Sequence, residues 1–180
     1  MNVLGLDTST SILALGIIDD DNILADVKIN QKESLSETLL TVVHRTLNKL
    51  NLEVQDISAL AYSIGPGSFT GLRVGLSFIK GMSFSTGIPV VAVPTLDALA
   101  TQVSSTNSFL VPILEAKKDE FYWAIYENKN GSPQKISNYM ILPFEKIVEE
   151  VPSNSLFISM NNNLEEKLKS LKTEKKEFIE

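Results

Sequence analysis

The sequence predicts an α/β fold built on a mixed β-sheet and divided into two lobes, of which the second is shortened. Three short apolar segments open the chain with only polar turns between them, which is typical of antiparallel strands. Strands and helices then alternate, so the later strands are expected to join the sheet in parallel. A polar stretch near residues 102–107 precedes a second series of strands. We therefore expect an N-terminal lobe at 1–104 and a smaller C-terminal lobe at 105–180.

Each element of the first lobe has its own sequence signal. Apolar residues recur at helical spacing in the first helix, whose start Ser34 or Ser36 is suited to cap. Gly87 and Pro89 end the second helix, and Pro94 suits the opening of the third. The expected strands are 2–7, 12–18, 23–29, 57–64 and 90–93, and the expected helices run over about 33–50, 69–86 and 95–103.

The order of these elements identifies the fold class. Three antiparallel strands that are followed by helix, strand, helix, strand and helix form the ribonuclease-H-like layout of the actin and sugar-kinase (ASKHA) fold. A dinucleotide-binding fold would instead begin with strand, helix and strand. The first lobe is therefore predicted to be actin-like.

The second lobe reads as a smaller copy of the same scheme. Its expected strands are 109–114, 120–126, 135–142 and 156–159, and its expected helices are 144–151 and 164–171. Both signs of charge alternate from Glu165 to Glu177, which is typical of a solvated helix face.

Composition excludes several classes of function. The net charge is −6, from 22 acidic and 16 basic residues, so we expect no strong nucleic-acid binding by this chain alone. Cysteine is absent, and His44 is the only histidine; thiolate and paired-histidine metal sites are therefore excluded. No apolar run approaches the roughly 20 residues of a membrane helix, so we expect a cytoplasmic protein without a membrane or metal partner.

The glycine-rich segment Gly65–Gly75 is the sharpest feature of the sequence. It lies between a buried strand and a helix, where backbone amides and the helix dipole can hold an anion. It lacks the lysine of a Walker A loop. Two interpretations stay open, an anion or nucleotide site and a tight turn with close helix–sheet contact. The candidate contacts are Gly65, Gly67, Ser68, Thr70, Gly71 and Arg73.

Two further segments carry charged or hydroxyl groups at turns. Asp7, Thr8 and Ser9 end the first strand, as in actin-like folds that hold a metal–phosphate group there. The alternative, which we favour for these residues taken alone, is an Asx turn in which Asp7 bonds its own backbone. The segment Glu115–Trp123 is favoured as a strand-to-strand turn with core aromatics. No residue is assigned a catalytic role.

Four segments together resemble the TsaB (YeaZ) family. They are Leu6–Thr10, Gly65–Gly75, Pro89–Leu99 and Glu120–Trp123, and the likeness is strong over residues 1–128. The chain departs from the family at Leu35, where many members have histidine, and at Glu115-Ala116-Lys117, where they have Asp-Ala-Arg. It is also shorter than most members.

The resemblance implies a non-catalytic subunit rather than an enzyme or a peptidase. Such a subunit supports the catalytic paralogue TsaD in a complex that forms threonylcarbamoyladenosine in tRNAs reading codons that start with A. It implies no cofactor of its own, with ATP used through the ATPase TsaE, and no strong direct binding of tRNA.

The resemblance also implies docking through the first two helices, with a homodimer when the partner is missing. The expected interface residues are Leu35, Leu39, Leu40, Val43, Gly71 and Gly75. The alternative function is a nucleotide-binding phosphotransferase of the actin and sugar-kinase class, in which Asp7 positions a metal and the glycine-rich segment holds phosphate.

Overall fold

The computed structural model describes residues 1–30, 34–103, 108–117, 119–129, 131–159, 164 and 176–179. The chain forms two compact units, which are called unit 1 (Met1–Thr95) and unit 2 (Leu96–Glu180). The boundary expected between residues 104 and 105 lies outside the described residues.

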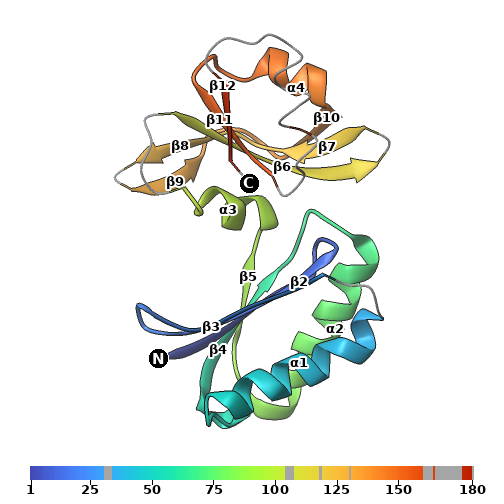
Figure 1. Cartoon of the computed structure of the whole chain (residues 1–180), viewed down its shortest axis with the longest axis vertical. Helices are drawn as coiled ribbons and strands as arrows, with labels where there is room; N and C mark the ends of the chain where they lie inside the picture. Colours follow the sequence, from blue (N-terminus) through green and yellow to red (C-terminus); the bar gives the residue numbers. More distant parts are fainter. Residues whose placement is uncertain are drawn as a thin grey trace. The chain divides into compact units, whose positions relative to one another are not determined.

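Unit 1 contains a five-stranded sheet in the order β3-β2-β1-β4-β5, with two long helices on it (Figure 1). Its elements are β1 (Asn2–Asp7), β2 (Ile12–Asp19), β3 (Asn22–Asn30), α1 (Leu35–Lys49), a single 3-10 turn η1 (Val54–Asp56), β4 (Ile57–Ser63), α2 (Phe69–Thr86) and β5 (Val90–Val93). β1, β2 and β3 pair antiparallel, whereas β4 and β5 join in parallel. The predicted ribonuclease-H-like, actin-like layout is confirmed.

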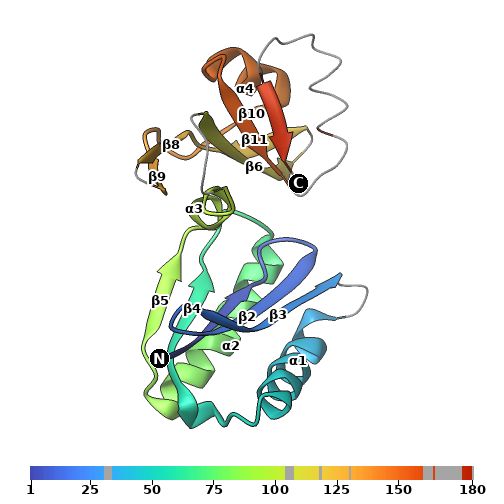
Figure 2. The same cartoon turned by 60° about the vertical axis from the view of Figure 1, so that its left-hand side comes forward.

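The core of unit 1 lies between one face of this sheet and the two helices. Side chains alternate across a strand, so Leu4 and Leu6 of β1 point to the helices and are buried with Leu15 and Ile17 of β2. Figures 1 and 2 show α1 and α2 side by side on this face. The arrangement leaves β3 at one edge of the sheet and β5 at the other.

The ends of α2 follow from its flanking residues. The Ser68 hydroxyl accepts a 3.2 Å hydrogen bond from the Gly71 amide and caps the helix start, a position for which serine is well suited. Gly87 ends the helix with a φ of 76°, a left-handed conformation that glycine adopts without strain. At the start of α1, Ser34 occupies the capping position, but its hydroxyl bonds the Ser36 hydroxyl instead of a helix amide.

Unit 2 repeats the strand order of unit 1. Its sheet has the path β10-β7-β6-β11-β12, in which β6, β7 and β10 are antiparallel neighbours and β11 and β12 follow in parallel. The described elements are α3 (Thr95–Ala100), which begins in unit 1, β6 (Phe109–Lys117), β7 (Glu120–Trp123), β8 (Tyr126–Lys129), β9 (Ser132–Lys135), β10 (Met140–Pro143), α4 (Phe144–Glu150), β11 (Ser155–Ile158) and β12 (Lys176–Ile179). The smaller-copy prediction is confirmed in this order.

Several predicted bounds in unit 2 were wrong. The strand expected at 120–126 is divided into β7 and β8, because β7 pairs with β10 whereas β8 leaves to pair with β9. The strand expected at 135–142 is likewise divided between β9 and β10. Lys176 and Glu177, expected on a helix face, lie in β12, because they pair in parallel with β11. The helix expected at 164–171 lies outside the described residues except for Leu164.

The aromatic residues of the Glu115–Trp123 segment belong to the core of unit 2. β6 and β7 form an antiparallel pair, and Phe121 and Trp123 are buried in it, whereas Glu115 and Lys117 are exposed. The favoured strand-to-strand interpretation of this segment is therefore confirmed.

Candidate functional site

The glycine-rich segment forms the turn between β4 and the first turn of α2. Gly65 has a φ of 101°, in the region that favours glycine. The Ser68 amide donates a 2.6 Å hydrogen bond to the Ser9 carbonyl, and the Gly71 amide donates to the Ser68 hydroxyl. Two of the amides that an anion would need are thus engaged within the chain.

Three glycines of this segment, Gly67, Gly71 and Gly75, lie against the end of β1. A Cβ atom on Gly67 would overlap the backbone of Ser9, and one on Gly71 would overlap the carbonyl oxygen of Thr8. A Cβ on Gly75 would overlap the Thr8 hydroxyl and the Tyr62 ring. The tight helix–sheet contact, one of the two interpretations left open by the sequence, therefore describes Gly71 and Gly75.

Asp7 forms the turn that the sequence left as an alternative. One carboxylate oxygen accepts a 2.6 Å hydrogen bond from the Ser9 amide, which is an Asx turn. The other oxygen accepts a 2.7 Å hydrogen bond from the Ser63 hydroxyl. Both oxygens of the half-buried carboxylate therefore have partners within unit 1.

Buried hydroxyl groups connect β1, β4 and α2. The Thr8 hydroxyl donates a 2.8 Å hydrogen bond to the Gly71 carbonyl and lies 3.1 Å from the Tyr62 hydroxyl. The Tyr62 hydroxyl donates a 2.7 Å hydrogen bond to the Leu72 carbonyl. Burial raises the pKa of Tyr62. The Ser9 hydroxyl is buried, and within the described part of the chain it has no hydrogen-bond partner.

Arg73 and Thr70 are not brought to the Asp7 turn by any described contact. The Arg73 guanidinium lies over the Phe69 ring, 4.5 Å from its centroid, and both residues are exposed. Thr70 is exposed at the first turn of α2. Asp7, Thr8, Ser9, Gly67 and Gly71 do lie together, as the sequence suggests, with Ser68 bonded to Ser9.

The structure separates the six expected interface residues into three groups. Leu39 and Val43 are buried in the core of unit 1, because the helical period turns them to the sheet. Leu40 is 64% exposed and Leu35 is half-buried. Gly71 and Gly75 are buried against β1 and β4. The two glycines, like Leu39 and Val43, are therefore not available to a partner in this conformation.

Sequence reasoning missed the outer side of α2, which carries a row of exposed apolar and basic residues. We call this row the α2 stripe: Phe69, Arg73, Leu76, Lys80 and Phe84. At 100° per residue the five positions fall within an arc of about 80°. Phe84 is 94% exposed and Phe69 is 70% exposed, and α2 contains no acidic residue. The helical spacing of these residues is the signal that could have identified the stripe.

Neither a metal site nor a membrane-spanning helix is found among the described residues. Within the described ranges, no three His, Cys, Asp or Glu side chains are grouped so that they could hold a metal ion. No helix among those ranges has the length and apolar character needed to cross a membrane.

Comparisons with known sequences identify the family. The family described as "TsaD: tRNA N6-adenosine threonylcarbamoyltransferase" matches residues 22–177. A Bacillus subtilis protein named "tRNA threonylcarbamoyladenosine biosynthesis protein TsaB" is 28% identical over 171 residues, which are 93% of this chain and 75% of the relative. Relatives with the same name from other bacteria also match.

Comparisons with solved structures concern the fold. YeaZ from Pseudomonas aeruginosa matches with a TM-score of 0.77 and 24% identity, over 87% of this chain and 75% of that one. A Bacteroides thetaiotaomicron protein with an actin-like ATPase fold and unknown function matches 99% of this chain and 90% of its own, with a TM-score of 0.54 and 12% identity. The fold is actin-like, and the chain belongs to the threonylcarbamoyltransferase (TsaD) family, in which it is similar over most of its length to proteins named TsaB.

Proposed function

We propose that this chain is a docking subunit of the complex that forms threonylcarbamoyladenosine in tRNAs reading codons that start with A. In this proposal the chain binds and supports a TsaD-like catalytic subunit and performs no chemistry itself. The observation that carries it is the α2 stripe, which exposes two phenylalanine rings on a helix with no acidic residue.

The chemistry of the stripe indicates what would cover it. Exposed aromatic rings on one helix face mark a partner surface, since burying them releases ordered water. Arg73 and Lys80 lie between the apolar side chains, so the partner surface should be apolar with acidic groups beside it. Leu40, exposed on α1, adds to the apolar surface of the two helices that the family resemblance assigns to docking.

The rest of the proposal rests on the resemblance to the TsaB family. ATP is used through a TsaE-like ATPase, the complex lies in the cytoplasm, and tRNA is held mainly by the partner, since this chain carries a net charge of −6. In the absence of the catalytic subunit, two copies associate more weakly through the phenylalanine rings of the same stripe, because α2 offers no acidic groups to meet Arg73 and Lys80.

The test replaces the two most exposed aromatic residues of the stripe. The double variant Phe69→Glu/Phe84→Glu should fold normally, because both side chains are in solvent. It should lose co-purification with the TsaD-like subunit, sediment as a monomer, and fail to support tRNA modification in a reconstituted reaction. The control variant Ile141→Glu, at an exposed apolar position in unit 2, should behave as the original chain. Undiminished binding by the double variant would exclude the stripe as the docking surface.

A second function, nucleotide-dependent phosphotransfer, rests on one observation. The Ser9 hydroxyl is buried beside Gly67 and has no partner within the described residues, which leaves a donor for a bound ligand. Against it, both oxygens of Asp7 are engaged by Ser9 and Ser63. Calorimetry of the isolated chain with magnesium ATP separates the two functions: binding with turnover favours the enzyme, and no heat of binding favours the docking subunit.

A further inference from the structure

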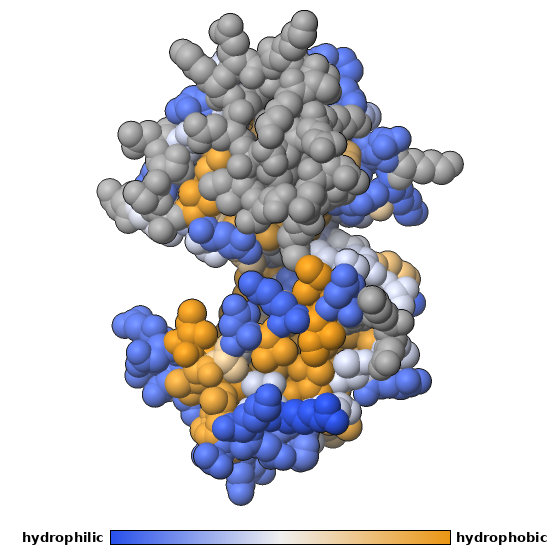
Figure 3. Space-filling view, in the orientation of Figure 1, coloured by the Kyte–Doolittle hydropathy of each residue, from blue (hydrophilic) through white to orange (hydrophobic). Residues whose placement is uncertain are grey.

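A groove runs between helix α1 and the edge strand β3 of unit 1, on the side of the sheet that the helices cover. Its cavity volume is about 480 Å³. Figure 3 shows hydrophobic side chains gathered between these two elements, with hydrophilic ones beside them along the helix. The groove has no role in the proposed function, which uses the outer side of α2.

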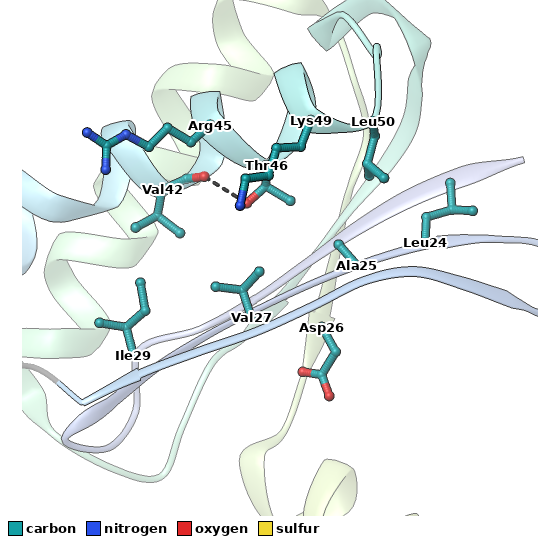
Figure 4. A pocket seen from close by; sticks show the side chains of 10 residues that line it. All are labelled: Leu24, Ala25, Asp26, Val27, Ile29, Val42, Arg45, Thr46, Lys49 and Leu50. Carbon is teal, nitrogen blue, oxygen red and sulfur yellow. Dashed lines mark hydrogen bonds between the residues drawn. The ribbon is translucent and has the colours of Figure 1, made fainter.

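The floor of the groove is apolar and only partly covered. Ala25, Val27 and Ile29 of β3 point towards α1, where Val42 and Leu50 meet them (Figure 4). The three β3 side chains are half-buried, in contact with the core on one side and open to the groove on the other. β3 and α1 run alongside each other in opposite directions, with Ile29 near Val42 and Leu24 near Leu50.

Two basic side chains line the helix side of the groove. Arg45 and Lys49 are four residues apart on α1, and both line the cavity (Figure 4). Among the described residues, neither forms an ion pair. Asp26, the one acidic lining residue, lies 3.6 Å from Lys28, and strand alternation places both on the opposite face of the sheet. The groove is therefore apolar on its floor and basic on its upper side.

The outer edge of β3 is open along the same groove. β3 is nine residues long and ends the sheet, and in the described part of the chain no strand pairs with its outer side. Its outward-facing amides and carbonyls can therefore accept a further strand. The side chains of such a strand would alternate, with every second one beneath α1.

We propose that an extended segment of another protein adds to the outer edge of β3, with acidic and apolar side chains on its inward face. Its apolar side chains lie beside Val27 and Ile29, and its carboxylates meet Arg45 and Lys49. Main-chain hydrogen bonds to β3 hold the segment, and the groove selects its side chains.

The spacing of the two cations fits alternate residues of a strand. Four residues of a helix span about 6 Å, and alternate residues of a strand are about 6.7 Å apart. Two carboxylates separated by one residue can therefore face Arg45 and Lys49 at once. A second copy of this chain fits less well, because edge-to-edge pairing would place two α1 helices, each with both cations, on the same face.

The experiment uses the full chain and a labelled nonapeptide, Thr-Val-Thr-Glu-Thr-Glu-Thr-Val-Thr, whose valines and glutamates share one face. Fluorescence anisotropy measures its binding, and hydrogen exchange followed by NMR locates it. We expect saturable binding that weakens with salt, together with slower exchange of the outward-facing β3 amides. The variant Arg45→Glu/Lys49→Glu should bind at least tenfold more weakly. Both positions are exposed, so the fold should be retained.

Matched controls separate the groove from general charge effects. The variant Lys129→Glu/Lys146→Glu makes the same change in net charge on unit 2 and should bind within twofold of the original chain. The peptide with lysine in place of glutamate should bind at least tenfold more weakly.

Three results would each overturn the proposal. The first is no binding at millimolar peptide, and the second is equal binding of the acidic and basic peptides. The third is protection of the β3 amides in the chain alone that fades on dilution, which would identify a second copy as the occupant.

Discussion

The hydroxyl group of Thr8 donates a 2.8 Å hydrogen bond to the carbonyl oxygen of Gly71, and the Gly71 Cα lies directly against the Thr8 backbone. The two residues are 63 positions apart, and their contact joins the end of β1 to the first turns of α2. It fixes the start of the helix that carries the α2 stripe.

A methyl group at Gly71 should destabilise unit 1. In Gly71→Ala the added Cβ meets a backbone carbonyl, which cannot rotate away, so we expect a loss of about 1–3 kcal/mol. Gly81→Ala is the control on the same helix, because nothing lies near its Cβ position; it should gain about 0.5–1 kcal/mol from helix propensity. Urea unfolding measures both, and equal stability of the two variants would contradict the close contact.

Removal of the Tyr62 hydroxyl should also weaken unit 1. Tyr62→Phe keeps the ring but loses the hydrogen bond to Leu72 and the contact with Thr8, at a cost of about 1–2 kcal/mol. Tyr122→Phe is the control, since the described residues provide no hydrogen bond to the hydroxyl of Tyr122. Thermal unfolding should separate the two variants.

Leu39 and Leu40 are neighbours in sequence but should respond differently to truncation. Leu39 is 2% exposed, and Leu39→Ala should cost about 2–5 kcal/mol through the cavity that it leaves. Leu40 is 64% exposed, and Leu40→Ala should stay within about 0.5 kcal/mol of the original chain. Chemical denaturation checks this, and a large loss for Leu40→Ala would mean that its side chain is not in solvent.

Unit 2 should become less stable at alkaline pH. Burial raises the pKa of Tyr126, and the neighbouring Asp97 carboxylate, which accepts a 2.5 Å hydrogen bond from the Tyr126 hydroxyl, raises it further. The folded state therefore keeps this proton above about pH 10, where the unfolded chain releases it. Stability from this residue is present below pH 10 and falls above it by up to about 1.4 kcal/mol per pH unit.

The variant Tyr126→Phe tests this assignment. Its unfolding free energy should decline less steeply between pH 10 and pH 11 than that of the original chain. Tyr139 also donates a hydrogen bond to Asp97, at 2.6 Å, which makes Tyr139→Phe the matched control. Because this variant keeps Tyr126, its unfolding free energy should retain most of the decline with pH. An unchanged slope in Tyr126→Phe would show that this residue is not its source.

The fold of unit 1 could be predicted because its signals are local. The strand and helix periods in residues 2–93 reflect which side chains face the core, and the order of elements leaves few topologies. The division between β7 and β8 could not be predicted. Both strands pair with β6, but across Ala124-Ile125 the chain exchanges β10 for β9 as its other neighbour, and tertiary contacts rather than the alternation of side chains set this choice.

The residues of the candidate site could be predicted from the sequence, but not whether they bind an anion or form a packed turn. The sequence pointed to Asp7 and to Gly65–Gly75, yet an anion site and a packed turn need the same residues there. Only the distance between β1 and α2 distinguishes them, and that distance depends on segments far apart in the chain. On α1, Leu39 and Val43 were expected at an interface, but they are buried because they cover the sheet.

The glycine contacts that anchor α2 all lie within Met1–Thr95. The residues that set the position of this helix are therefore independent of the length of the second half of the chain. Related proteins could lose or gain residues there during evolution while still presenting α2 in the same way.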